Sequence, residues 1–158
     1  MKTTNYLHLN EAYAVSAVEK LNKLTANFHV YYSNLRAFHW HVEGSSFFVL
    51  HEQLEKMYDG LAENIDEVAE RILQLGGTPV RLFKDIESLA TLKQAEKVSK
   101  ESDIVEQVLE SISLFIKLER EILALAAENG DDTTVGLISE YLKDQEKLVW
   151  MLTAYLKK

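Results

Sequence analysis

Cysteine is absent from the 158 residues of this chain, and proline occurs once. Without cysteine the chain cannot form a disulfide, a thiol catalytic site or a Cys-ligated zinc site. It also lacks a run of about 18 or more apolar residues, which excludes a transmembrane helix. The N-terminal residues MKTTNYLHLNEAY do not show the charged and apolar blocks of a secretory signal. We therefore expect a cytoplasmic protein with no membrane partner.

Positive charge is scarce. Lysine and arginine together number 17 against 25 aspartates and glutamates, which gives a formal net charge of −8 and a pI near 5.1. Phosphate backbones attract lysine and arginine, so this balance argues against nucleic acid as a partner. Cations are the more natural small partners of an acidic chain.

Four segments of the chain have the apolar spacing of an amphipathic helix. The first runs from Asn10, a candidate N-cap, to His41, and the second follows the EGSS turn with Ser46 as its candidate cap. The third begins near Asp103, which has capping-box spacing to Glu106. The fourth starts at 131–133 and runs to the C-terminus. We expect one domain that spans 1–158, with residues 1–9 as its flexible tail.

Each segment has a stripe of apolar residues at helical spacing, which predicts the core. The stripes are Leu21, Leu24, Phe28, Tyr31, Leu35 and Phe38; Leu50, Leu54, Met57, Leu61, Ile65, Val68, Ile72 and Leu75; Val105, Val108, Ile112, Phe115, Leu118, Ile122 and Leu125; and Ile138, Tyr141, Leu148, Leu152 and Tyr155. No strand pattern competes with them. The sequence therefore predicts an all-α protein.

Connection lengths predict how these helices are arranged. Short turns join the first helix to the second and the third to the fourth, whereas residues 76–102 form a long connection. A long connection lets the third helix run parallel to the second, as in a ferritin-like four-helix bundle with one crossover. Within it, residues 81–89 predict a short extra helix that covers an otherwise exposed apolar strip.

Metal sites in such bundles are built from facing side chains, and a di-iron site within one bundle uses Glu-x-x-His on two helices. No histidine here follows a glutamate at that spacing, which disfavours such a site. His39 lies near the core seam at the end of the first helix, and His51 lies just across the EGSS turn. We expect these two to face each other, and we interpret His8, His29 and His41 as core or surface residues.

The second helix also has an acidic strip beside its apolar stripe: His51, Glu55, Asp59, Ala62, Asp66 and Glu70. A solvated flank, with Asp66 and Glu70 paired to Arg71 or to lysines, is one interpretation. A shared metal site is the other, but His51 and Asp66 lie about 22 Å apart along one helix. Metal ligands lie about 2 Å from their ion. Antiparallel pairing of this helix with its copy in a second chain would bring the two halves together.

Four short motifs give the chain a resemblance to a known family: HW at 39–40, LHE at 50–52, DEVAER at 66–71 and LGG at 75–77. Their residues and spacings resemble the ferroxidase motif of the Dps family, the mini-ferritins. The helical layout, with a short helix between the second and third long helices, is also similar. The resemblance therefore covers nearly the whole chain.

This resemblance implies a hollow shell of twelve subunits with iron sites at two-fold interfaces. Each site would use His39 and His51 of one chain with Asp66 and Glu70 of its neighbour, and Glu55 where several relatives have aspartate. Two irons would bind at each site as Fe(II) and be oxidised to Fe(III), usually by hydrogen peroxide, and the ferric product would be stored inside the shell. Trp40 either packs beside the site or is an ordinary structural aromatic residue. Iron entry through acidic pores would use Glu128, Asp131 and Asp132.

Two other functions remain open, and so does the metal. Some members of that family compact DNA through a basic tail, but this chain offers only Lys2 before Lys20, and Lys157 and Lys158 at its end. We therefore expect weak or no DNA binding. A non-catalytic helical interaction module is the third possibility. Zinc or manganese could use the same ligands as iron.

Overall fold

The computed structural model describes residues 3–157, which form helices and connecting segments without a β-strand. The helices in chain order are α1 (Thr3–Leu7), α2 (Glu11–His41), α3 (Phe47–Gln74), α4 (Phe83–Leu89), α5 (Glu101–Glu128) and α6 (Asp132–Leu156). None of these helices is long and apolar enough to cross a membrane. The predicted all-α class is confirmed.

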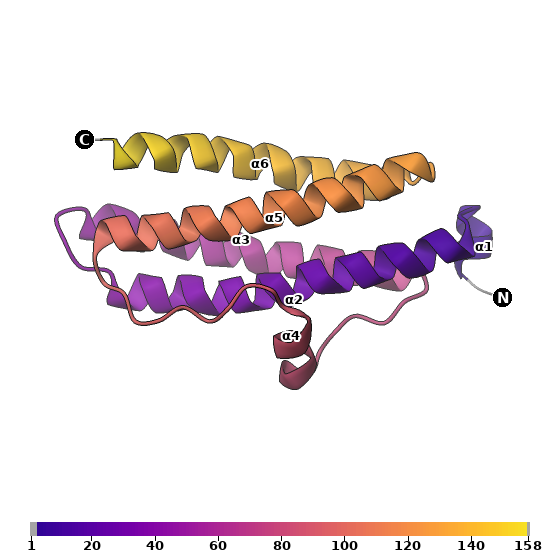
Figure 1. Ribbon diagram of the computed structural model, residues 1–158, viewed down its shortest axis with the longest axis horizontal. Helices are drawn as coiled ribbons and strands as arrows, with labels where there is room; N and C mark the ends of the chain where they lie inside the picture. The colour runs from indigo at the N-terminus through magenta and orange to yellow at the C-terminus, as the bar shows by residue number, and fades with distance from the viewer. Residues whose placement is uncertain (1–2, 158) are drawn as a thin grey trace.

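The four long helices lie side by side as a bundle (Figure 1). Helix α2 packs against α3, α4 and α5, and α5 packs against α6. The connection after α3 runs back along the bundle through α4, so that α5 starts at the same end as α3 and runs parallel to it (Figure 1). This is the predicted ferritin-like crossover, with the predicted short helix inside it.

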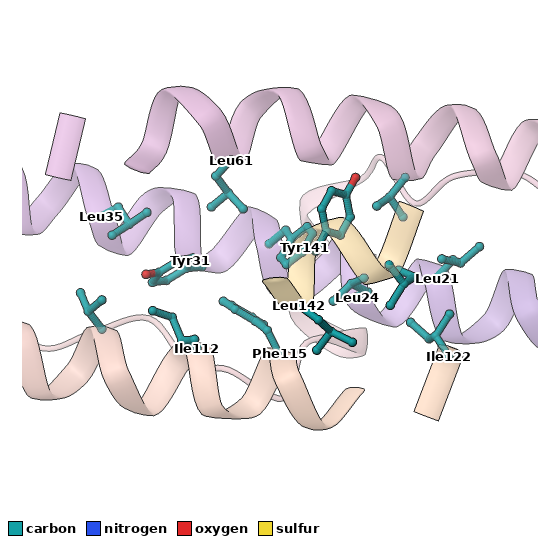
Figure 2. Packing of buried hydrophobic residues seen from close by; sticks show 14 of the residues in the cluster. Leu21, Leu24, Tyr31, Leu35, Leu61, Ile112, Phe115, Ile122, Tyr141 and Leu142 are labelled. Carbon is teal, nitrogen blue, oxygen red and sulfur yellow. The ribbon is translucent and has the colours of Figure 1, made fainter. Parts of the chain in front are cut away.

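The core consists of the predicted apolar stripes turned toward one another (Figure 2). All six predicted residues of α2 are buried, and α3 and α5 bury most of theirs. Phe28 and Phe115 meet edge to face at 5.2 Å between ring centroids and join α2 to α5. Only the end of α6 departs from the pattern, because Tyr155 is exposed.

The helix ends agree only in part with the expected caps. Asn10 does cap α2, where its side chain accepts hydrogen bonds from two backbone N–H groups of the first turn. The side chain of Ser46 makes no capping bond at the start of α3. The expected capping box at Asp103 and Glu106 is wrong, because α5 already begins at Glu101.

Three asparagines of α2 fasten the long connection to the bundle. Asn22 accepts from the N–H of Val80 at 2.7 Å and donates to a nearby carbonyl. Asn27 accepts from two backbone N–H groups of the segment after α4, and Asn34 both accepts from and donates to that segment. Between these anchors Ile86 of α4 packs on α2, as the lid interpretation predicted. These asparagine side chains therefore satisfy several backbone polar groups of the connection.

The N-terminal segment differs from the expected flexible tail in the residues that the structure describes. Residues 3–7 form helix α1, and Thr4 is buried. The backbone N–H of Leu9 donates to the carbonyl of Thr4 at 3.2 Å, which closes this helix before α2 begins. The first two residues, including Lys2, lie outside the described part.

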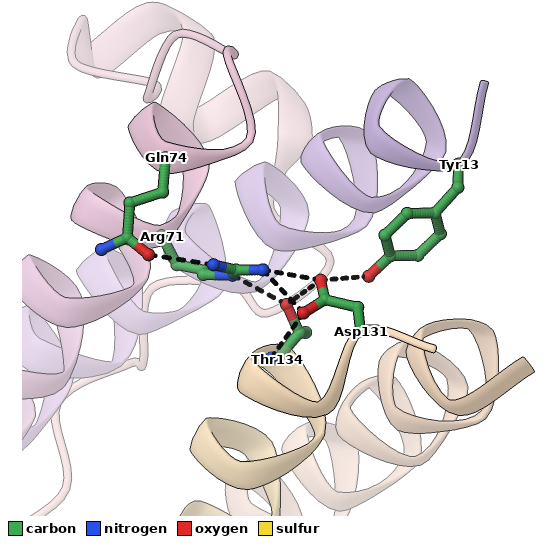
Figure 3. A network of polar contacts seen from close by, with 5 residues as sticks. All are labelled: Tyr13, Arg71, Gln74, Asp131 and Thr134. Carbon is green, nitrogen blue, oxygen red and sulfur yellow. Dashed lines mark hydrogen bonds and ion pairs between the residues drawn. The ribbon is translucent and has the colours of Figure 1, made fainter. Parts of the chain in front are cut away.

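A buried ion pair ties α3 to the start of α6 (Figure 3). The Arg71 guanidinium donates to both carboxylate oxygens of Asp131 at 2.7 Å, and the hydroxyls of Tyr13 and Thr134 donate to the same carboxylate. Burial alone would raise the pKa of Asp131, but these hydrogen bonds outweigh it and lower the pKa to about 2. The network joins α2, α3 and α6 at one end of the bundle.

We expect Asp131→Asn to lower the free energy of unfolding at pH 7 by about 3 kcal/mol, because the change leaves the Arg71 charge buried without its partner. The wild-type carboxylate has a lowered pKa, so its contribution is present at neutral pH and is lost as the pH falls from 3.8 to about 2. Urea unfolding at pH 7 and pH 3 should show the difference between the two proteins shrinking. Exposed Asp132→Asn is the matched control, and an equal loss in that variant would contradict this role for the ion pair.

Candidate metal centre

His39 and His51 meet where the last turn of α2 lies against the start of α3. Their rings stack, with centroids 3.7 Å apart and planes 19° from parallel. His39 is buried and His51 is half-buried. The expectation that these two histidines face each other across the EGSS turn is therefore met in a single chain.

Reciprocal hydrogen bonds fix both rings. Nδ1 of His39 lies 2.8 Å from the carbonyl oxygen of His51, and Nδ1 of His51 lies 2.8 Å from the carbonyl oxygen of His39. A carbonyl oxygen only accepts, so each Nδ1 must carry the proton and donate it. In the tautomer with the proton on Nδ1, the lone pair of the ring lies on Nε2. Fixing the tautomer in this way prepares an imidazole to bind a metal ion through its second nitrogen.

Aromatic side chains surround the two histidines. Phe47 stacks on the His51 ring at 5.1 Å, and Tyr58 meets the His39 ring edge to face at 5.5 Å. Trp40, which follows His39 in the sequence, is 61% exposed. The guanidinium carbon of Arg36 lies 4.9 Å from the centroid of the Trp40 ring. The apolar contacts restrict ring rotation, whereas Trp40 faces solvent in the single chain.

Of the three carboxylates expected as ligands, Asp66 and Glu70 lie too far along α3 to reach the histidines of the same chain, whereas Glu55 lies one helical turn after His51. Glu55, Asp66 and Glu70 are all exposed. At the helical rise, Asp66 is about 22 Å along the axis from His51. Among residues 3–157 no three His, Asp or Glu side chains gather closely enough to hold one metal ion. Each chain therefore presents two separate parts, a histidine pair and an acidic pair.

Within the part of the chain that the structure describes, none of the other three histidines belongs to a group of His, Asp or Glu side chains that could hold a metal ion. His41 is exposed and His8 lies in the left-handed region of the backbone at φ 56°. Burial lowers the pKa of His29, which favours its neutral form. These positions agree with the interpretation of all three as core or surface residues.

The expected pore residues do not share one environment. Glu128 and Asp132 are exposed near the turn between α5 and α6. Asp131 instead points inward to Arg71 and is only 3% exposed. Its expected role in lining a pore is therefore wrong, because the buried ion pair engages both carboxylate oxygens. The earlier alternative that Arg71 pairs with Asp66 or Glu70 is also wrong.

One buried carboxylate, Glu119 of α5, was not predicted from the sequence. It is fully buried, and Nε2 of Gln145 donates to its Oε1 at 2.6 Å. Its Oε2 has no hydrogen-bond partner. Burial raises the pKa of Glu119 to about 7, against the lowering effect of the Gln145 bond. Its spacing of four residues from Phe115 placed it on the core stripe and could have identified it.

Comparison with known proteins agrees with this geometry. Residues 18–158 match the ferritin-like domain family. The structure superposes on that of a Dps protein from Vibrio cholerae, described as one of the ferritin-like diiron-carboxylate proteins, with a TM-score of 0.92 and 38% identity over 94% of each chain. The fold and the match over most of its length define the class: this chain is a ferritin-like protein.

Two curated relatives narrow the family further. A protein of Porphyromonas gingivalis named DNA protection during starvation protein is 47% identical over 95% of this chain and 94% of its own length. DNA protection during starvation protein 2 of Bacillus anthracis is 34% identical over 88% and 95%. The chain belongs to the Dps family. Membership of this family supports a role in iron storage and stress protection.

Glu119 gives a pH-dependent test of the core. Its raised pKa means that the folded state holds the proton more tightly, so stability falls as the pH rises from 4.5 to about 7. Glu119→Gln should remove a penalty on the order of 3 kcal/mol at pH 8 and change little at pH 5. Unfolding in urea at both pH values measures this, with exposed Glu110→Gln as control. A variant that is less stable than wild type at pH 8 would show that the ionised carboxylate stabilises the fold.

Proposed function

We propose that this chain is a ferroxidase and iron-storage protein that works as a hollow dodecamer in the cytoplasm. Fe(II) is its substrate, hydrogen peroxide is the oxidant, and ferric iron collects inside the shell. The observation that carries the proposal is the histidine pair, because both Nδ1 atoms are bound to carbonyls and both Nε2 atoms are free for a metal. The dodecameric assembly and the oxidant in this proposal are those that the resemblance to the Dps family implies.

In this proposal each site lies between two copies of the chain. His39 and His51 of one copy meet Asp66 and Glu70 of a second copy when their α3 helices pair antiparallel about a two-fold axis. Glu55, one helical turn after His51, would reach the second of two irons. Imidazole and carboxylate ligands together suit Fe(II), although zinc and manganese accept the same donors.

The chemistry follows from pairing the metal ions. Two Fe(II) ions supply both electrons that reduce one peroxide to water, with two protons taken up. A single iron would supply only one electron and release hydroxyl radical. A site that holds two irons together therefore consumes iron and peroxide without that radical, which agrees with a role in stress protection.

Replacing His39 and His51 together by glycine should abolish rapid Fe(II) oxidation, because the two imidazoles are the proposed iron ligands. The shell should stay assembled, because the proposed role of these side chains is to bind iron and not to pack in the core of another subunit. Stopped-flow absorbance after mixing with peroxide, and separately with oxygen, measures the rate, and light scattering measures the assembly. His41→Gly is the matched control, since His41 is an exposed histidine of the same turn. Undiminished oxidation in the double variant would exclude the histidine pair as the site.

Mixing two inactive variants tests whether the site is shared. The His39→Gly, His51→Gly chain is refolded together with an Asp66→Asn, Glu70→Gln chain. Random pairing should restore about one quarter of the sites, since every mixed dimer holds one intact and one doubly damaged site. Oxidation that stays at the level of the separate variants would place all ligands in one chain and contradict the proposal.

DNA compaction is a second candidate function, and two relatives are named for DNA protection during starvation. We propose that direct binding is weak, because the chain has a net charge of −8 and its terminal lysines are few. Lys2 and Lys158 lie outside the residues that the structure describes. A gel shift at low salt should show no retarded DNA without Mg²⁺. Tight binding without Mg²⁺ would overturn this expectation.

A further inference from the structure

Glu101, the first residue of α5, connects three parts of the bundle at the end where the histidine pair lies. Its Oε1 accepts a hydrogen bond from the backbone N–H of Ser46, and its Oε2 accepts one from the Tyr155 hydroxyl of α6 at 3.2 Å. Beside it, the N–H of Glu43 donates to the carbonyl of Ser99 at 2.8 Å. The turn between α2 and α3 is thereby held against the start of α5.

Helix α3 has no cap of its own that would do this. The side chain of Ser46 makes no capping bond, and the first turn of α3 contains no acidic residue. In a capping box a glutamate of the same helix accepts from the N–H of the N-cap residue. Glu101 performs that role from a different helix, and its carboxylate also places negative charge at the positive end of the α3 dipole.

The shape of the turn fits this carboxylate. Gly44 has φ +134°, a backbone conformation that L side chains rarely adopt. A Cβ built on Gly44 would also collide with the carboxylate of Glu101. Glycine is thus required at 44 both for its conformation and for the close approach of Glu101.

The turn controls the distance between the two histidines. His39 lies in the last turn of α2 and His51 in the second turn of α3, and each ring bonds to the backbone carbonyl of the other residue. A shift of the turn would change both ring–carbonyl distances at once. We propose that Glu101 is a positioning residue that holds the α2–α3 turn so that His39 and His51 keep the geometry of a metal site.

This inference rests on the proposed function, and its test uses Co(II) as the metal probe on the intact assembly. Glu101→Ala should weaken Co(II) binding about tenfold, as loss of a supporting contact around metal ligands does. It should raise the KM for Fe(II) more than it lowers kcat. Hydrogen exchange of the 42–51 backbone should speed up, while the helix content stays unchanged. Glu101→Gln keeps an acceptor for Ser46 and should restore affinity to near the wild-type level.

Exposed Glu106→Ala on the same helix is the control for loss of an acidic side chain. An equal loss of Co(II) affinity in that variant, or unchanged affinity in Glu101→Ala, would overturn the positioning role. The His39→Gly, His51→Gly variant separates the two proposals. If the histidine variant loses Co(II) binding while Glu101→Ala binds Co(II) normally, the positioning role of Glu101 is rejected and the proposed metal site is not. Normal binding in the histidine variant rejects the proposed site and the positioning role with it.

Discussion

The rise of about 1.5 Å per residue along α3 is the constraint on which the arrangement of the proposed ligands depends. It separates the histidine pair from Asp66 and Glu70 by far more than the radius of one metal site. Neither part can be moved toward the other without breaking the helix, whose apolar stripe is buried along its length. A single copy therefore has a hydrophobic core of its own but only parts of the proposed metal site. The distance makes the assembly of copies a chemical requirement of the proposed reaction.

Polar side chains fix the bundle where apolar packing leaves freedom. Apolar stripes bring the helices together, but they do not determine the path of a long connection or the position of a turn along the bundle axis. Asn22, Asn27 and Asn34 bind the backbone of the connection, and Arg71 binds Asp131 at one end of the bundle. The reciprocal bonds of His39 and His51 act in the same way at the other end. Most of these buried polar groups are satisfied, as stable cores require.

Much of the fold could be predicted because it depends on local spacing. The stripe of Leu50, Leu54 and Leu61 predicted a buried helix face, and the structure confirms it. The prediction failed where a partner is distant in the sequence. Ser46 was expected to cap α3, but the carboxylate that serves the turn comes from Glu101. Asp131 was expected at a pore because of the resemblance to the Dps family, yet it pairs with Arg71, sixty residues earlier. Glu119 was missed although its spacing matched the stripe.

The sequence by itself determined the four helices, their order, the crossover and the identity of the proposed ligands, because helical periodicity, turn residues and motif spacing are encoded locally. Tertiary structure alone decided which nitrogen of each histidine is free. That choice depends on two backbone carbonyls that lie across the turn from the rings. It also decided that Asp131 is buried and that Glu101 braces the turn. Such contacts depend on the relative positions of whole helices, which short-range patterns do not specify.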